Sequence, residues 1–454
     1  MSRRRVLVTG IGMVAPVGRS AAECWAACLG GHAVTGPIPE SWPRATGSRA
    51  TAWAPLPAID CTASGVTPLE AMRFDRATIL AAVAAGEAVA DAGLVATPAD
   101  PKRGIWRLEG IDEERAGVFM GTAVGGITTL IESQNSHILG PLQPLGGPGV
   151  LPETIPCVAA LRTLLATLPP RFNPFTVAMV MANAIASTLG IRYSLRGPNE
   201  SPTLACAAGT VAVGHALRSI RAGHTDMVLC GGAEFVGDPF GGVFRGFDTA
   251  KTLAAVVDRP ETANRPFDRG RTGFLLAEGG AAVLVCEEEE HARRRGRAAY
   301  AELVGYGESF DAYSPMIAEP SGAQFARAVA AALVDATITP DAVDYLNAHG
   351  TGTVVNDEVE SAVIERLFGV RPLVNATKSL TGHCLGATGA IEAAITALSL
   401  HHQQVHGCVN LDDPVRPLNF ARRSTDARLT WAVSQSSAFG GHNAALVMRR
   451  AESP

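Results

Sequence analysis

The sequence predicts an α/β fold with mostly parallel sheets that helices cover on both faces. Three observations predict it. Short apolar runs alternate with helical patterns along the chain, which is typical of strand–helix–strand units. Of the 454 residues, 47% are hydrophobic, so a large core is possible. Residues 1–265 and 266–454 have a similar order of elements, and we therefore expect two duplicated halves.

The N-terminal half begins with a buried strand, because residues 5–14 form a short run of apolar and β-branched side chains. Ser20 and Glu23 have the spacing of a capping box, which predicts a helix that ends at Gly30–Gly31. The other elements expected in this half are a helix starting at Thr67–Glu70, a helix over 75–91, a strand with a glycine loop over 117–126, a helix over 205–222 and a strand over 226–234.

The C-terminal half repeats this alternation. Val359, Val363 and Leu367 form one stripe of a helix that Gly369 ends. The other expected elements are strands over 281–290, 300–307, 343–349 and 372–378, a helix capped by Ser321 and Gln324 that runs to about Asp335, a helix over 386–402, and a glycine turn plus strand over 436–448.

Residues 140–174 differ from the rest of the chain. They are rich in proline and glycine, and the pattern predicts a long loop that encloses a short helix. Long loops in compact enzymes often cover or shape a site. A surface insertion without a role is an equal alternative.

Composition excludes several functions. The net charge is −5, so no basic field exists for nucleic acid. No apolar run reaches about 20 residues, which argues against a membrane span. The start, MSRRRVLVTGIG, has only a strand-sized apolar run and no signal-peptide pattern, so we expect a cytoplasmic protein. Nine irregularly spaced cysteines without a CxxC pair indicate neither a disulfide framework nor a structural metal site.

Cys206 is the first candidate for chemistry. It lies among small residues where a helix is expected to begin. The positive end of the helix dipole lowers the pKa of a thiol at this place, and free backbone N–H groups there bind an oxyanion. A cysteine among alanines is, taken alone, more often a core residue.

Two histidines and a lysine supply the rest of the pattern. His349 lies in NAHGTGT, just past an apolar strand, while Lys378 and His383 lie at a strand-to-helix crossing. Lys378 is one of three lysines, with Lys102 and Lys251, against 35 arginines. Open α/β sheets bind ligands where strands end, so a thiol and two imidazoles at such turns indicate covalent thioester chemistry. Near the C-terminus, the glycines after Phe439 allow backbone N–H groups to approach a substrate.

At these residues the chain resembles a β-ketoacyl-acyl carrier protein synthase of the condensing-enzyme, thiolase-like family. The resemblance covers nearly all 454 residues. It rests on VTGIGMVAPVG, IRYSLRGPN, CGGAE, RPFDRGRTGF with AEGGAAVLV, NAHGTGT, TKSLTGHCLGATGAIEA and FGGHN, which occur in the family's order. The resemblance implies an αβαβα layered, thiolase-like fold made of two duplicated halves, an acyltransferase activity of the ketosynthase type, and a homodimer or a heterodimer with a ketosynthase-like subunit.

The resemblance also implies roles for single residues. Cys206 would take the acyl chain from a carrier thioester, and His349 and His383 would assist decarboxylation of a malonyl-type extender. Lys378 would organise the site electrostatically, and Glu360 would be the acid that pairs with that lysine. The N–H of Phe439 would complete an oxyanion hole with that of Cys206, and the Phe439 ring would gate the pocket. Thr351 and Thr353 would contact the pantetheine arm. No metal or organic cofactor is implied, and the substrates are carried on the phosphopantetheine of an acyl carrier protein.

The sequence departs from the family pattern in several places. Ser437 and Ala438 replace the usual Phe-Gly pair before Phe439, His442 replaces a threonine, and Thr272 replaces an aspartate. Ala277 stands where a glycine or similar small residue is usual, and the 140–174 segment is about 25 residues longer than usual. These differences favour a specialised polyketide or polyene pathway over housekeeping fatty acid synthesis.

Four further questions stay open at this point. Arg73 and Arg76 are candidates for docking the acidic carrier protein, although arginines are often merely solvated. The same fold could transfer the acyl group to another nucleophile or start chains by decarboxylation alone. A non-catalytic partner like a chain-length factor usually lacks the cysteine, so Cys206 weighs against it. A thiolase would need a second catalytic cysteine in place of one histidine, and Cys384 does not fit that pattern.

Overall fold

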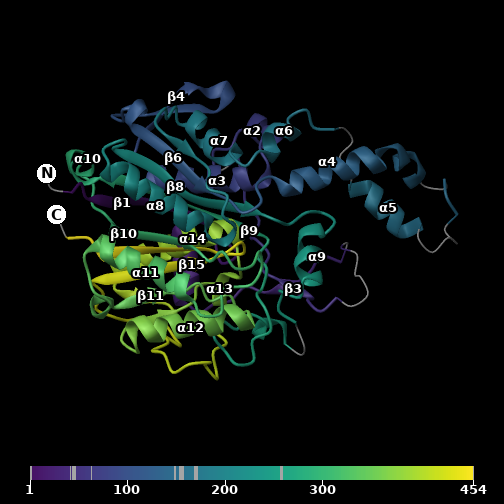
Figure 1. The fold of residues 1–454 in the computed structure, drawn as a ribbon. Coiled ribbons are helices and arrows are strands. Elements are labelled where there is room, and N and C mark those ends of the chain that lie inside the picture. The colour runs from purple at the N-terminus through teal and green to yellow at the C-terminus, as the bar shows by residue number, and fades with distance from the viewer. Residues whose placement is uncertain are drawn as a thin grey trace.

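A computed structural model describes residues 3–40, 42, 48–62, 64–147, 150–152, 158–167, 172–255 and 259–452. Its centre is a ten-stranded sheet in the order β12-β11-β15-β16-β10-β1-β9-β8-β6-β7 (Figure 1). The strands are β1 (Val6–Val14), β6 (Ala116–Gly121), β7 (Asn199–Glu200), β8 (Met227–Phe235), β9 (Gly279–Glu288), β10 (Ala301–Phe310), β11 (Tyr345–Asn347), β12 (Leu373–Asn375), β15 (Trp431–Ser437) and β16 (His442–Arg450).

The sheet consists of two sets of five strands with the same order. Within each set the strands can be numbered one to five along the chain. Counted outward from the central β1–β10 pair, both sets then have the order one, five, four, two, three. The predicted duplication is therefore present in the topology. β9 lies on the C-terminal side of the predicted 265/266 division, yet it pairs with β1 and β8. The exact division of the chain stays a prediction.

The prediction of mostly parallel strands was wrong. β6 pairs in parallel with β7 and β8, and β11 pairs in parallel with β12 and β15. The other pairs in this sheet are antiparallel. An apolar run shows that a strand is buried, but it does not determine the direction of its neighbours.

Helices complete five layers. α8 (Ala208–Arg221) and α14 (Thr388–His402) pack between the two sets of strands, α3 (Arg76–Asp91) covers the outer face of the first set, and α11 (Ala323–Ala336) covers that of the second (Figure 1). The described helices also include α1 (Ala21–Leu29), α2 (Pro68–Arg73), α4 (Ile127–Leu139), α5 (Val158–Thr167), α6 (Thr176–Val180), α7 (Ala184–Arg192), α9 (Gly242–Thr249), α10 (Glu289–Arg294), α12 (Val354–Phe368) and α13 (Lys378–Thr381). None of them is long and apolar enough to cross a membrane.

Local signals located most helix ends correctly. Ser20 caps α1, Thr67 and Glu70 form a complete capping box at α2, and Asp75 caps α3. The predicted start at Ser321 and Gln324 is shifted, because Gly322, with a left-handed φ of 60°, takes the N-cap position of α11. Ser321 Oγ still accepts the N–H of Ala323, the first residue of the helix, at 3.2 Å. Short two-stranded sheets complete the fold: β2 (Gly36–Pro37) with β3 (Ala52–Trp53), β4 (Ala96–Asp100) with β5 (Ile105–Leu108), and β13 (Gln404–Val405) with β14 (Thr425–Asp426).

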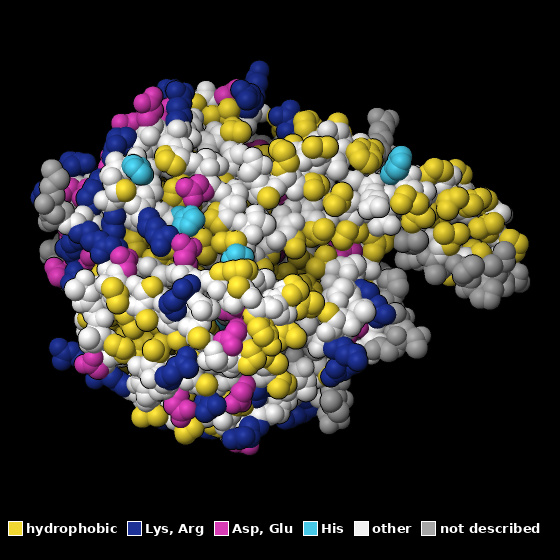
Figure 2. Space-filling model, in the orientation of Figure 1, with side chains coloured by type: hydrophobic (Ala, Val, Ile, Leu, Met, Phe, Trp, Pro, Cys, Tyr) yellow, Lys and Arg dark blue, Asp and Glu magenta, His cyan; other side chains and the backbone are white. Residues whose placement is uncertain are grey.

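The segment 140–174 belongs to an arm that projects from the layered body. A 3-10 turn, Gly140–Gly146, follows α4, and α5 is the short helix expected inside the segment (Figure 1). Hydrophobic side chains are spread along this arm (Figure 2). They include the exposed Ile138, Leu142 and Leu145. Residues 148–149, 153–157 and 168–171 of the segment lie outside the described part of the chain.

Candidate active site

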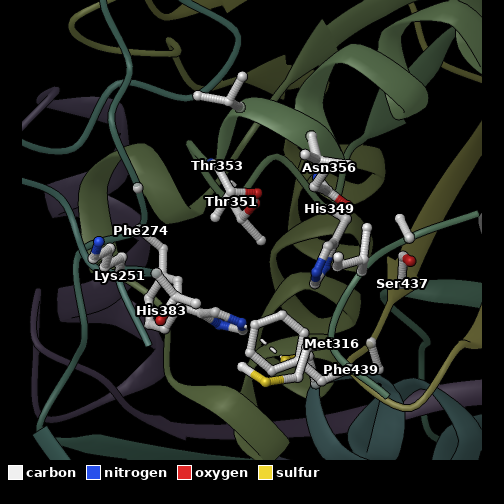
Figure 3. Close-up of a pocket in the computed structure, with 18 of the residues that line it drawn as sticks. Lys251, Phe274, Met316, His349, Thr351, Thr353, Asn356, His383, Ser437 and Phe439 are labelled. Carbon is white, nitrogen blue, oxygen red and sulfur yellow. Dashed lines mark hydrogen bonds between the residues drawn. The ribbon is translucent and has the colours of Figure 1, made fainter. Parts of the chain in front are cut away.

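Six of the predicted residues converge on one cavity of about 250 Å³, drawn in Figure 3, whereas Lys378 and Glu360 are not in its lining. His349 follows β11 by two residues and Lys378 follows β12 by three. Phe439 lies in the turn between β15 and β16, and Cys206 lies one turn before α8. The site is therefore built where strands end, as the sequence predicted. The side chains of Cys206, His349, His383, Thr351, Thr353 and Phe439 all line the cavity.

Cys206 is presented by a strained backbone that the sequence did not predict. Ala205 has a left-handed φ of 47°, a conformation that costs a residue with a side chain about 1–2 kcal/mol. Cys206 then starts the first turn of the helix that continues into α8, as expected. Its side chain is 6% exposed at the cavity wall. The sharp turn brings the sulfur to the end of the sheet beside the imidazoles.

The expected lowering of the thiol pKa is wrong in direction. Burial raises the pKa of Cys206 to about 11, and it outweighs the lowering effects of the Lys378 ammonium and the Phe439 N–H. Loss of hydration destabilises the thiolate more than the start of the helix stabilises it. The resting group is therefore a thiol at neutral pH, and its ionisation needs help from neighbours.

His383 is the neighbour within reach, with Nε2 3.0 Å from Cys206 Sγ. The N–H of Leu385 donates to His383 Nδ1 at 3.3 Å, so Nδ1 acts as an acceptor. In a neutral imidazole the proton is then on Nε2, which points at the sulfur. The pKa of His383 lies well below its usual value, because of burial and the Lys378 ammonium. His383 is thus a neutral hydrogen-bond donor toward the cavity.

His349 is held in the same tautomer by a different partner. Lys378 Nζ donates to His349 Nδ1 at 3.1 Å and also to the His349 carbonyl oxygen. Burial and the Lys378 charge lower the pKa of His349 well below its usual value. Its Nε2–H therefore faces the cavity too. The two rings lie 5.7 Å apart between centroids and almost perpendicular, so both N–H groups can reach one oxygen (Figure 3).

The predicted pairing of Glu360 with Lys378 is wrong. Lys378 Nζ is 2.6 Å from Glu392 Oε1 on α14, and both residues are fully buried. Glu360 instead accepts the N–H groups of His349 and Gly350 at 2.6 and 2.7 Å. It positions the histidine loop through the backbone. An acid inside the buried, largely apolar stretch 388–400 was the sequence signal that could have identified Glu392.

Burial raises the pKa of two acids near the lysine, Glu392 and Glu360. Burial raises the pKa of Glu392 to about 7, and the ammonium of Lys378 opposes that rise. Burial also raises the pKa of Glu360 to about 7, although four hydrogen-bond donors, Gln435 among them, oppose that rise.

Glu234, which sequence reasoning did not select, joins two loops at the site by accepting the N–H groups of Ala123 and Gly386.

Thr351, Thr353 and Phe439 complete the predicted part of the cavity lining. Thr351 and Thr353 are joined by a 2.9 Å hydrogen bond between their hydroxyl groups. Gly440 and Gly441, which follow Phe439, have left-handed φ values of 87° and 84°, so this turn favours glycine at both places. Met316 and Ile317, which the sequence did not indicate, also line the cavity. Of the departures, Thr272 accepts the Ala255 N–H at 3.0 Å.

The sulfur and the two imidazoles could also hold a metal ion. One ligand atom from each of Cys206, His349 and His383 lies within 4.8 Å of the others. Cysteine sulfur and histidine nitrogen are both zinc ligands, and three protein ligands leave a fourth position open. The lysine ammonium bonded to His349 Nδ1 fits an anion-stabilising role of the same imidazole.

Family models match most of the chain. The N-terminal domain of β-ketoacyl synthase matches residues 3–291, and the C-terminal domain matches residues 300–412. A curated relative, the 3-oxoacyl-[acyl-carrier-protein] synthase 2 of Vibrio harveyi, is 37% identical over 99% of both chains.

Solved structures agree with this assignment. The ishigamide ketosynthase/chain length factor is 30% identical, with a TM-score of 0.79 over 99% of both chains. A type II polyketide synthase acyl-carrier protein in complex with its ketosynthase, bound to the hexaketide, is 28% identical, with a TM-score of 0.79 over 99% of this chain and 100% of that chain. The thiolase-like αβαβα fold expected from the sequence is confirmed.

Proposed function

The chain belongs to the β-ketoacyl synthase family, and we propose that it condenses an acyl group held on Cys206 with a malonyl-type thioester held on an acyl carrier protein. The product is a β-ketoacyl thioester, and the enzyme is an acyltransferase of the ketosynthase type. The observation that carries the proposal is the convergence of one thiol and two neutral Nε2–H donors on one cavity.

The first half-reaction is acyl transfer. Cys206 sulfur attacks the acyl carbonyl of a carrier thioester, the bond from that carbonyl to the carrier sulfur breaks, and the cysteine proton leaves with the carrier thiol. We propose that the backbone N–H groups of Cys206 and Phe439, which both favour the thiolate form of Cys206, also donate to the acyl carbonyl oxygen as negative charge develops on it. His383 Nε2–H stabilises the thiolate as it forms.

The second half-reaction makes the carbon–carbon bond. The malonyl carboxylate leaves as carbon dioxide, and its bonding electron pair passes into an enolate on the extender thioester. His349 and His383 donate to the enolate oxygen, an effect of about 3–4 kcal/mol per donor in comparable sites. The enolate carbon then attacks the acyl carbonyl on Cys206, and the cysteine leaves as a thiolate that recovers a proton. Holding both groups in one cavity supplies the proximity.

The substrate arm would enter past Thr351 and Thr353, which both line the cavity. The arm is the phosphopantetheine of the carrier protein, and the proposed reaction uses no metal or organic cofactor. Arg73 and Arg76 are exposed, on α2 and at the start of α3, and they are the proposed carrier contacts. We also propose a dimer, either with a second copy or with a ketosynthase-like subunit, and a cytoplasmic location.

Mass spectrometry tests this function directly. The protein is incubated with an acyl-carrier thioester, and the mass of acyl-Cys206 is sought. Malonyl-carrier is then added, and we expect carbon dioxide and a chain longer by two carbons. A Cys206→Ala protein that still elongates would reject the mechanism. Carbon dioxide without elongation would favour a chain-initiating decarboxylase, and neither acylation nor carbon dioxide would favour a non-catalytic partner of the chain-length-factor type.

The pathway is the last part of the proposal. Ser437 and Ala438 at the gating turn differ from the usual family residues, and relatives of known structure include polyketide ketosynthases. We therefore infer a specialised polyketide or polyene pathway. A panel of acyl-carriers of different length and unsaturation, offered singly and followed by intact mass, would identify the accepted starter.

A further inference from the structure

Lys251 is a charged residue of the cavity to which neither the sequence nor the proposed reaction assigns a role. It lines the same cavity as Cys206, but its side chain is exposed where the sulfur is buried. Among the described residues of this lining, Lys251 alone carries a formal charge, because burial keeps both imidazoles neutral. Figure 3 shows it on the opposite side of the drawn residues from His349 and Ser437.

The backbone holds Lys251 in an unusual conformation. It follows the end of α9, its N–H donates to the Asp248 carbonyl at 2.9 Å, and its φ is 59°. Glycine is the residue that such helix ends favour, because a side chain is strained there. Lys251 is one of only three lysines in the chain, and it places an ammonium group on a loop whose backbone conformation is fixed.

That loop is tied to the catalytic centre. The N–H of Phe274 donates to the Thr252 carbonyl at 3.0 Å, and Phe274 packs edge-on against the His383 ring at 5.2 Å between centroids. Within the described part of the chain, no carboxylate lies within 4.0 Å of the Lys251 ammonium, whereas Lys378 has Glu392. The charge of Lys251 is therefore positioned relative to the site and available to an anionic ligand.

We propose that Lys251 binds the phosphate of the phosphopantetheine arm while the thioester end of that arm lies at Cys206. This inference rests on the proposed function and adds a specificity-determining residue to it. An ammonium on a flexible stem binds phosphate as a point charge. A thioester substrate has its reacting carbonyl at one end of the arm and its phosphate at the other. The cavity is lined by a buried thiol and by an exposed lysine, one group for each end of such an arm.

The test compares two small donors that differ only in the phosphate, butyryl-pantetheine and butyryl-4′-phosphopantetheine. The rate of acylation of Cys206 by each is followed by intact mass at low ionic strength. In the unaltered protein we expect the phosphorylated donor to have a kcat/KM about tenfold higher. In Lys251→Met this preference should fall to near one, and Lys251→Arg should restore most of it.

Lys102→Met is the matched control, because Lys102 is an exposed lysine of the η1 turn outside the cavity lining. It should keep the preference, and all variants should show the same alkylation rate of Cys206 by iodoacetamide. An unchanged preference in Lys251→Met, or no preference in the unaltered protein, would overturn the inference alone. Failure of both donors to acylate Cys206 in the unaltered protein would overturn the proposed function as well.

Carrier-bound and free forms of the arm are distinguished in a second step. Butyryl-carrier and butyryl-coenzyme A are offered at equal concentration to the unaltered protein and to Lys251→Met. A similar loss with both donors, together with loss of the phosphate preference, supports recognition of the shared phosphate. A loss confined to the carrier donor, with the small-molecule preference intact, would overturn the proposal in favour of a contact to the carrier protein surface.

Discussion

The ammonium of Lys378 lies 2.6 Å from Glu392 on α14, so the buried positive charge of the site is balanced from the central helix layer and not from Glu360 on α12. Lys378 in turn bonds both the Nδ1 and the carbonyl oxygen of His349. The ion pair therefore determines which nitrogen of His349 faces the cavity. A change at Glu392 should affect both folding and the extender reaction.

Glu392→Gln should destabilise the protein by about 3–5 kcal/mol, because a buried ammonium loses its counter-charge. Urea unfolding measures this loss, and the rate of carbon dioxide release measures the effect on His349. Glu358→Gln, an exposed change on α12, is the control and should alter neither quantity. A Glu392→Gln protein with unchanged stability would show that the pair is not needed.

Alkylation of Cys206 by iodoacetamide should accelerate with pH throughout the range from 7 to 10. The thiolate is the reactive form, and a pKa of about 11 leaves the group mostly protonated in this range. Each pH unit should therefore raise the rate roughly tenfold. Intact mass at several pH values gives the rates, with Cys206→Ala as the control for other thiols. A plateau below pH 8 would contradict the raised pKa.

Removal of each imidazole should slow a different set of reaction steps. His383 touches the sulfur at 3.0 Å, whereas His349 is bonded to Lys378. We expect His349→Ala to lose carbon dioxide release by about 10²–10³-fold and still form acyl-Cys206. His383→Ala should slow both half-reactions. Single-turnover acylation and release of labelled carbon dioxide separate the steps, and equal loss of acylation in both variants would refute this division.

Zinc should inhibit the enzyme, because the sulfur and both imidazoles can share one ion and would then no longer be free for substrate. Elongation should stop on addition of Zn²⁺ and return after EDTA. EDTA alone should leave the rate unchanged if the reaction is metal-independent, as proposed. The control is a Cys206→Ala protein, which should bind no zinc in a dialysis assay. A loss of activity with EDTA alone would contradict metal independence.

Much of the architecture could be predicted from local pattern. The capping signals at Thr67, Glu70 and Asp75 depend only on neighbouring residues, and they located α2 and α3 correctly. The direction of strand pairing could not be predicted in this way. The central residues of β9 and β16 are buried like those of the parallel strands, although both strands pair antiparallel with their neighbours.

The sequence by itself determined the reacting groups. Cys206, His349 and His383 lie in small-residue turns next to apolar strands, and such turns come together wherever strands end at one edge. Only the tertiary structure decided that Glu392 pairs with Lys378 and that burial raises the thiol pKa. Both depend on distances and on loss of water between segments far apart in the chain, and these arise only when the layers pack.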